Sequence, residues 1–111
     1  MQVIATKITQ NPAIVKFELD EIIVRTQNFE FKNIDETQNS PLAKQLFYLP
    51  FVKTVYISGN FIAIEKFSIV EWEDVQEDVA NQINEFITNG GEIIKIDEST
   101  TKKQPITVYA E

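Results

Sequence analysis

The sequence contains no cysteine and no histidine among its 111 residues. Their absence excludes disulfide bonds, thiolate nucleophiles and imidazole general bases, together with the usual ligands of zinc, haem and iron–sulfur centres. Carboxylates, lysines, tyrosines and hydroxyl groups remain, and few enzymes work with that set alone. Glycine and proline are also scarce, with three and four residues, which argues against low complexity and disorder.

Positive charge is in short supply as well. The chain carries 10 basic against 17 acidic residues, a formal net charge of −7. Such a field repels nucleic acid and anionic membrane surfaces. No apolar run approaches the ~20 residues that span a bilayer, and the first twelve residues resemble neither a signal peptide nor a transit peptide. We therefore expect a soluble, cytoplasmic protein without a nucleic-acid or membrane partner.

The apolar residues that are present, 43% of the chain with eight phenylalanines, suffice for one hydrophobic core. Their spacing and the turn residues between them predict two helices and about five strands. The strands are expected at Val3–Thr9, Ala13–Phe17, residues 28–33, Phe51–Ile57 and Phe61–Lys66, and the helices at residues 41–49 and 72–87.

Local chemistry supports the ends of these elements. Ser40 is suited to cap a helix whose first position is Pro41, and Pro50 requires that helix to end near Leu49. Alternation in the first strand places Ile4, Thr6 and Ile8 on one half-buried face. The class expected is α+β, a mainly antiparallel sheet of four to five strands with two helices packed on one face.

The sequence predicts two parts of the chain. Residues 1–91 form the predicted domain, and residues 92–111 form a linker towards a further C-terminal domain. From about Glu98 onward we expect mobility, because the polar run offers little apolar surface against the entropy cost of ordering.

The acidic group at residues 71–78 is the first candidate site. A calcium loop needs alternating acids and a glycine at the bend, whereas these acids begin a helix, where the helix dipole favours negative charge. Glu73 and Glu77 also lack a pocket that would raise the pKa of either carboxyl for acid–base catalysis. A solvated helix end is the preferred interpretation.

A glycine pair, three lysines and six aromatic residues are further candidates for a site. Gly90 and Gly91 end a helix and are not followed by the Lys-Ser/Thr of a phosphate loop, so a helix cap is preferred. Three lysines could lie close together on the sheet, but they form an ordinary surface more often than an anion site. Six aromatic residues are most simply core, and an aromatic cage is the alternative. The lysines are Lys16, Lys53 and Lys66. The aromatic residues are Phe29, Phe31, Phe47, Phe61, Phe67 and Trp72.

Several blocks, in this order, resemble the N-terminal domain of Nfu/NifU-type iron–sulfur cluster scaffold proteins over residues 3–90. They are Thr9-x-Asn11-Pro12 with Lys16-Phe17, Ser40-Pro41-Leu42-Ala43 with Leu46-Phe47, Val52 to Tyr56, Phe61 to Lys66, and Trp72. Phe51 departs from the pattern, which has Gly after Pro, so we expect a different loop there with an exposed aromatic ring. Ala63 stands where Thr is usual, and we expect that change to matter little.

The resemblance implies a role in the maturation of iron–sulfur proteins. Such proteins hold the cluster on a C-x-x-C motif in a separate C-terminal domain, and this chain has no cysteine. We therefore expect no cofactor, no metal ligand and no catalytic residue in this chain. The expected function is a non-catalytic module that recognises iron–sulfur apoproteins or assembly factors, or acts beside its own C-terminal cluster-binding domain. A small-molecule-binding regulatory domain remains the alternative, and an acid–base enzyme ranks last.

Overall fold

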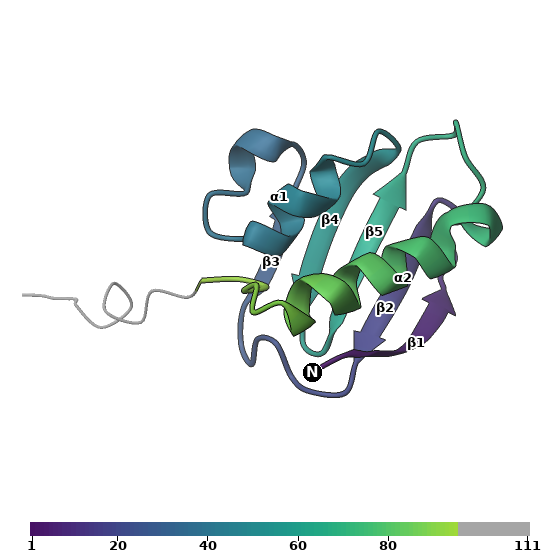
Figure 1. Ribbon diagram of the computed structural model, residues 1–111. Helices are drawn as coiled ribbons and strands as arrows, with labels where there is room; N and C mark the ends of the chain where they lie inside the picture. Colours follow the sequence, from purple (N-terminus) through teal and green to yellow (C-terminus); the bar gives the residue numbers. More distant parts are fainter. Residues whose placement is uncertain (96–111) are drawn as a thin grey trace, which may run out of the picture.

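The computed structural model describes residues 1–95, which fold around one five-stranded antiparallel sheet (Figure 1). The strands run in the order β1-β2-β5-β4-β3, so β1 and β3 form the two edges. Their bounds are β1 (Val3–Ile8), β2 (Ile14–Leu19), β3 (Asn28–Phe31), β4 (Val52–Ser58) and β5 (Phe61–Lys66).

Both α-helices lie against the same face of this sheet, and no helix of residues 1–95 lies on the opposite face (Figure 1). They are α1 (Pro41–Phe47) and α2 (Trp72–Thr88), and a short 3₁₀ helix, η1 (Ile34–Glu36), precedes α1. The predicted α+β class is therefore confirmed. Among the described residues, no helix is both long and apolar enough to cross a bilayer.

The start of α1 follows the predicted chemistry and adds a contact far along the chain. The Ser40 hydroxyl oxygen accepts a hydrogen bond from the Ala43 N–H at 3.1 Å, which satisfies one of the free donors at the helix end. The same hydroxyl donates to the Ile93 carbonyl at 2.6 Å. Ser40 is fully buried, so it ties α1 to the last described segment.

Helix α2 ends at the glycines, as expected. The Gly91 N–H donates to the Phe86 carbonyl at 2.9 Å and the Gly90 N–H to the Ile87 carbonyl at 3.0 Å. This is the Schellman arrangement, and it needs a residue with positive φ, which Gly90 supplies at φ 88°. The helix-cap interpretation of the two glycines is confirmed.

The core lies between the helices and the sheet. Alternate residues of the central strands point towards the helices, as the period of a strand requires. Fully buried members are Phe17, Leu19, Leu42, Leu46, Val55, Ile57, Ile62, Ile64, Val79 and Ile83.

Two expectations about exposure are wrong. Ile4 and Ile8 are 59% and 84% exposed. The register of β1 shifts between Val3 and Ala5, beside Ile4, and Ile8 is the last residue of this edge strand. The Phe51 ring is buried, not exposed, and packs edge-on against Trp72 with ring centroids 6.4 Å apart.

Contacts of the domain continue past residue 91. Ile93 is buried in the core, and the Lys95 N–H donates to the Asn39 carbonyl at 2.6 Å. The division into a domain of residues 1–91 and a linker of residues 92–111 stays a prediction. The expected mobility from Glu98 onward concerns residues outside the part of the chain that the structure describes.

Candidate functional site

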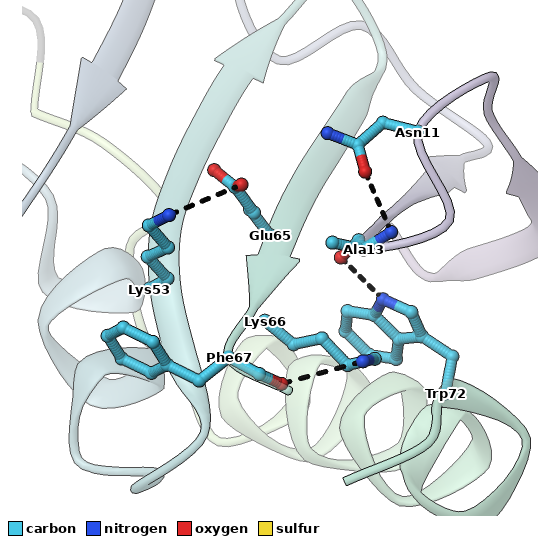
Figure 2. A network of polar contacts seen from close by, with 7 residues as sticks. All are labelled: Asn11, Ala13, Lys53, Glu65, Lys66, Phe67 and Trp72. Atoms are coloured by element: carbon cyan, nitrogen blue, oxygen red, sulfur yellow. Dashed lines mark hydrogen bonds and ion pairs between the residues drawn. The ribbon is translucent and has the colours of Figure 1, made fainter. Parts of the chain in front are cut away.

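The Thr9–Ala13 turn is the first place to examine for function, because it carries one of the recognised sequence blocks. The Asn11 side-chain oxygen accepts the Ala13 N–H at 2.9 Å (Figure 2). The Thr9 hydroxyl lies 2.9 Å from the Asn11 carbonyl and 3.0 Å from the Ile14 carbonyl, within donating distance of both. These bonds close the turn between β1 and β2, so Thr9 and Asn11 serve the fold.

Trp72 is fixed to this turn. Its indole N–H donates to the Ala13 carbonyl at 2.7 Å (Figure 2). The Lys66 backbone N–H donates to the same oxygen at 3.0 Å. The ring also packs edge-on against Phe17, with centroids 5.8 Å apart. The first residue of α2 is thereby anchored to β2 and to the end of β5.

The acidic residues at the start of α2 lie on an exposed helix end. Glu73 and Asp74 occupy the first turn, and Glu77 and Asp78 are exposed like them. Within residues 1–95, no three acidic side chains gather closely enough to hold a metal ion. A solvated helix end, favoured by the helix dipole, accounts for these residues.

The ammonium groups of the three lysines lie near three different partners. The Lys16 ammonium lies 4.4 Å from the centroid of the Phe61 ring. The Lys53 ammonium lies 3.8 Å from the Glu65 carboxylate, and that of Lys66 lies 3.5 Å from the Phe67 carbonyl (Figure 2). These separate partners favour an ordinary surface over an anion site.

The aromatic residues divide into two groups. Phe31 and Trp72 are buried and Phe29 and Phe47 pack against the core, as expected. Phe61 and Phe67 are not core residues: Phe61 is half-buried on the helix-free face, and Phe67 is 46% exposed. The core interpretation is wrong for these two.

The helix-free face of the sheet is the candidate binding surface, which we call the open face. Its outward-pointing residues alternate along the strands with the core residues, and most are half-buried. They are Ile14, Lys16 and Glu18 of β2, Glu30 of β3, Thr54 and Tyr56 of β4, and Phe61, Ala63 and Glu65 of β5.

Aromatic and charged side chains meet on the open face. The Tyr56 and Phe61 rings lie 6.2 Å apart with a tilt of 35°, and the Lys16 ammonium covers the Phe61 ring. Tyrosine and phenylalanine in such a mixed setting are typical of contact surfaces. The position of Tyr56 could be predicted from the sequence. Val55 and Ile57 point to the core, so the alternation of a strand places the Tyr56 side chain on the open face.

A second group of apolar side chains lies on loops. Tyr48, Phe67 and Ile69 are 62%, 46% and 67% exposed. The loops after α1 and after β5 are neighbours, since the Phe67 N–H donates to the Phe51 carbonyl at 2.8 Å. Single exposed apolar residues are common on monomeric proteins, so this group carries less weight than the open face.

Sequence comparison places this chain beside known proteins. Residues 4–90 match the family described as scaffold protein Nfu/NifU N terminal. The chain is 33% identical over 88 residues to the NFU1 iron-sulfur cluster scaffold homolog of Drosophila sechellia, and 31% identical over 88 residues to that of Homo sapiens. Each match covers 78% of this chain, but only 31% and 35% of the relative, so the chain spans about a third of their length.

Structure comparison agrees on the fold. A solution structure of a NifU-like protein from Saccharomyces cerevisiae is similar with a TM-score of 0.72 and 24% identity, over 86% of this chain and 87% of that one. A crystal structure of a Staphylococcus aureus protein gives 0.65 at 22% identity, over 75% and 99% of the two chains. The two relatives named above are called mitochondrial, and the expected cytoplasmic location of this chain stays a prediction.

Proposed function

This chain belongs to the N-terminal family of Nfu/NifU iron–sulfur cluster scaffold proteins, and on that premise we propose that it is a non-catalytic module that binds other proteins during cluster assembly or delivery. The observation that carries the proposal is the open face, a sheet surface free of helices within residues 1–95 and bearing the Tyr56–Phe61 ring pair. The partners we propose are iron–sulfur apoproteins, assembly factors, or a C-terminal cluster-binding domain of its own protein.

The donor atoms of this chain do not fit an iron–sulfur cluster. Cluster iron is held by cysteine thiolates, occasionally with histidine, and the sequence has neither residue. Its carboxylates are hard oxygen donors, which suit other metals. We therefore assign the cluster to another domain and derive no step through it. Anaerobic reconstitution with iron and sulfide should leave this chain without a visible absorption band, and a retained band with stoichiometric iron would contradict the assignment.

The regulatory alternative, a small-molecule-binding domain, is not favoured by the family match. A hollow of about 390 Å³ is lined by the charged residues Asp20, Glu21 and Arg25 and by the apolar residues Leu19, Ile22 and Val24. Another, of about 540 Å³, is bordered by Asp35, Lys44 and Lys95. Ligand sites are mostly apolar with a few placed polar groups, whereas three charged side chains border each of these hollows.

The interaction role is tested by affinity capture with matched variants. The immobilised chain is expected to enrich proteins that mass spectrometry identifies as iron–sulfur apoproteins or assembly factors. Tyr56→Thr removes an open-face ring while keeping a strand-forming residue, so it should reduce that enrichment. Tyr48→Thr removes an exposed tyrosine from the α1 end and serves as control.

Two results would refute the proposal. One is capture of no iron–sulfur protein beyond what an unrelated acidic domain retains. The other is equal enrichment by the Tyr56 variant and the parent chain, with both shown to be folded by circular dichroism. The second result would remove the open face as the contact surface.

A further inference from the structure

A hollow lies in the middle of the open face, and the register of the sheet explains it. Tyr56 is opposite Glu30 on one side and opposite Ala63 on the other, and Ala63 is opposite Lys16. Ala63 is therefore a short side chain in a row of long ones. The hollow has a volume of about 250 Å³, and we call it the Ala63 groove.

The lining of the Ala63 groove is apolar with acidic margins. Ile14, Ala63 and the Tyr56 ring provide apolar surface, with Thr54 beside them. Glu30 and Glu65 border the same hollow.

Within residues 1–95, the carboxylates of Glu30 and Glu65 are not neutralised by strong ion pairs. Lys53 approaches Glu65 only to 3.8 Å with half of its own side chain exposed, which is a weak, solvent-screened contact. Glu30 makes no ion pair among residues 1–95, where the ion pairs are those of Met1, Lys7 and Lys53. Lys16 belongs to the same row, but its ammonium lies over Phe61.

Size and charge together select the occupant. Sites for drug-sized ligands have volumes of roughly 300–1,000 Å³, so the groove suits a single side chain better than a cofactor. An arginine or lysine side chain combines an aliphatic stem for Ile14 and Ala63 with a cation for an aromatic ring and carboxylates. The net charge of −7 favours the approach of such a group.

We propose that the Ala63 groove binds a basic side chain, arginine or lysine, presented by a partner protein. The stem lies against Ile14 and Ala63, and the cation lies beside Tyr56, Glu30 and Glu65. The partner's identity as an iron–sulfur protein rests on the proposed function, whereas the chemistry of the groove does not.

The groove is tested directly by NMR titration of the full ¹⁵N-labelled chain. The probe is the tripeptide acetyl-Gly-Arg-Gly-amide, and its control is the same peptide with citrulline, which has the shape of arginine without the charge. One solvent-exposed side chain should bind with a dissociation constant of the order of 1 mM. The amides of Tyr56, Ala63 and Glu65 should shift with arginine and stay in place with citrulline.

Three variants locate the interaction. The double change Glu30→Gln and Glu65→Gln should weaken arginine binding about tenfold, since both charged contacts are lost. Glu77→Gln with Glu85→Gln removes the same charge from α2 and should leave binding unchanged. Ala63→Val fills the groove without altering its charge, and it should abolish the shifts in a chain that remains folded.

The proposal is overturned by equal shifts with citrulline, by an unchanged affinity for the arginine peptide in the Glu30/Glu65 variant, by shifts that persist in Ala63→Val, or by no shift at these amides at millimolar peptide. Affinity capture then separates this proposal from the function. If the Glu30/Glu65 variant enriches iron–sulfur proteins as the parent does, the proposal for the Ala63 groove is refuted and the proposed function is retained. If the arginine peptide binds but no iron–sulfur protein is captured, the proposal for the Ala63 groove is retained and the proposed function is refuted.

Discussion

Ser40 makes two buried hydrogen bonds through one hydroxyl, and its replacement by alanine gives a sharp test of how the domain is held together. The change removes the cap on the Ala43 N–H, at a cost of about 1 kcal/mol. It also leaves the Ile93 carbonyl without its buried donor, at a cost of about 1–3 kcal/mol. We expect Ser40→Ala to lower the free energy of unfolding by about 2–4 kcal/mol, measured by urea denaturation with an unchanged slope.

Shortened chains separate the two bonds. In a chain of residues 1–95, Ser40→Ala should lower the free energy of unfolding by the full 2–4 kcal/mol, about the sum of the two costs above. A chain of residues 1–91 lacks Ile93, so the substitution there removes only the hydrogen bond to the Ala43 N–H. Ser40→Ala should then cost about 1 kcal/mol, and the difference between the two backgrounds is the coupling energy. Ser68→Ala, on an exposed loop, should stay within about 0.5 kcal/mol in both.

An equal cost of Ser40→Ala in the two backgrounds would refute the reasoning, because the bond to Ile93 would then contribute nothing. The same pair of chains tests the domain boundary. If residues 1–91 are as stable as residues 1–95, the sequence-based boundary is right. Ile93 is buried, so its loss should cost about 1.5–3 kcal/mol and place the boundary at Lys95 or beyond.

Three further predictions concern stability, each measured by urea denaturation. Trp72→Phe loses the indole bond to the Ala13 carbonyl and should cost about 1–2 kcal/mol, whereas a change below 0.5 would remove its anchoring role. Gly90→Ala forces a Cβ onto a backbone with φ 88° and should cost about 1 kcal/mol, and a neutral result would contradict the cap geometry. Ile8→Ala should be near neutral while Leu46→Ala costs about 2–5 kcal/mol, and equal costs would contradict the assigned exposure of β1.

The elements predicted well are those whose ends depend on local chemistry. Ser40 and Pro41 start α1 where the sequence indicates, and Gly90 ends α2 by its backbone freedom. Gly59, with φ 54°, turns the β4–β5 hairpin. In each case the determining residues lie within a few positions of the boundary, so no knowledge of the fold is needed.

The errors concern contacts between distant residues. Alternation along β1 cannot reveal the bulge between Val3 and Ala5, because the bulge exists only in the pairing with β2. The burial of Phe51 depends on Trp72 being in place, and the family pattern of glycine at that position suggests the opposite.

The open face was predictable in part. The period of β4 and β5 determines that Tyr56 and Ala63 point away from the helices. The hollow at Ala63 could not be predicted without the register across three strands, which places the short side chain between Lys16 and Tyr56. If the groove binds as we propose, Ala63 matters more than the family resemblance implies, since a longer side chain there would fill it.

The strand segments that resemble the family contain both core residues and outward-pointing residues, and the match to the family does not distinguish the two. In β5, Ile62 and Ile64 point to the core, whereas Ala63 and Glu65 point to the open face. The match to the family is evidence for both sets at once, but their physical roles differ. Changes at the first set should alter stability and leave the binding of the folded fraction unchanged. Changes at the second set should do the reverse, because those side chains make few core contacts. On the proposed function, the residues that select a partner are therefore the outward residues of β2, β3, β4 and β5.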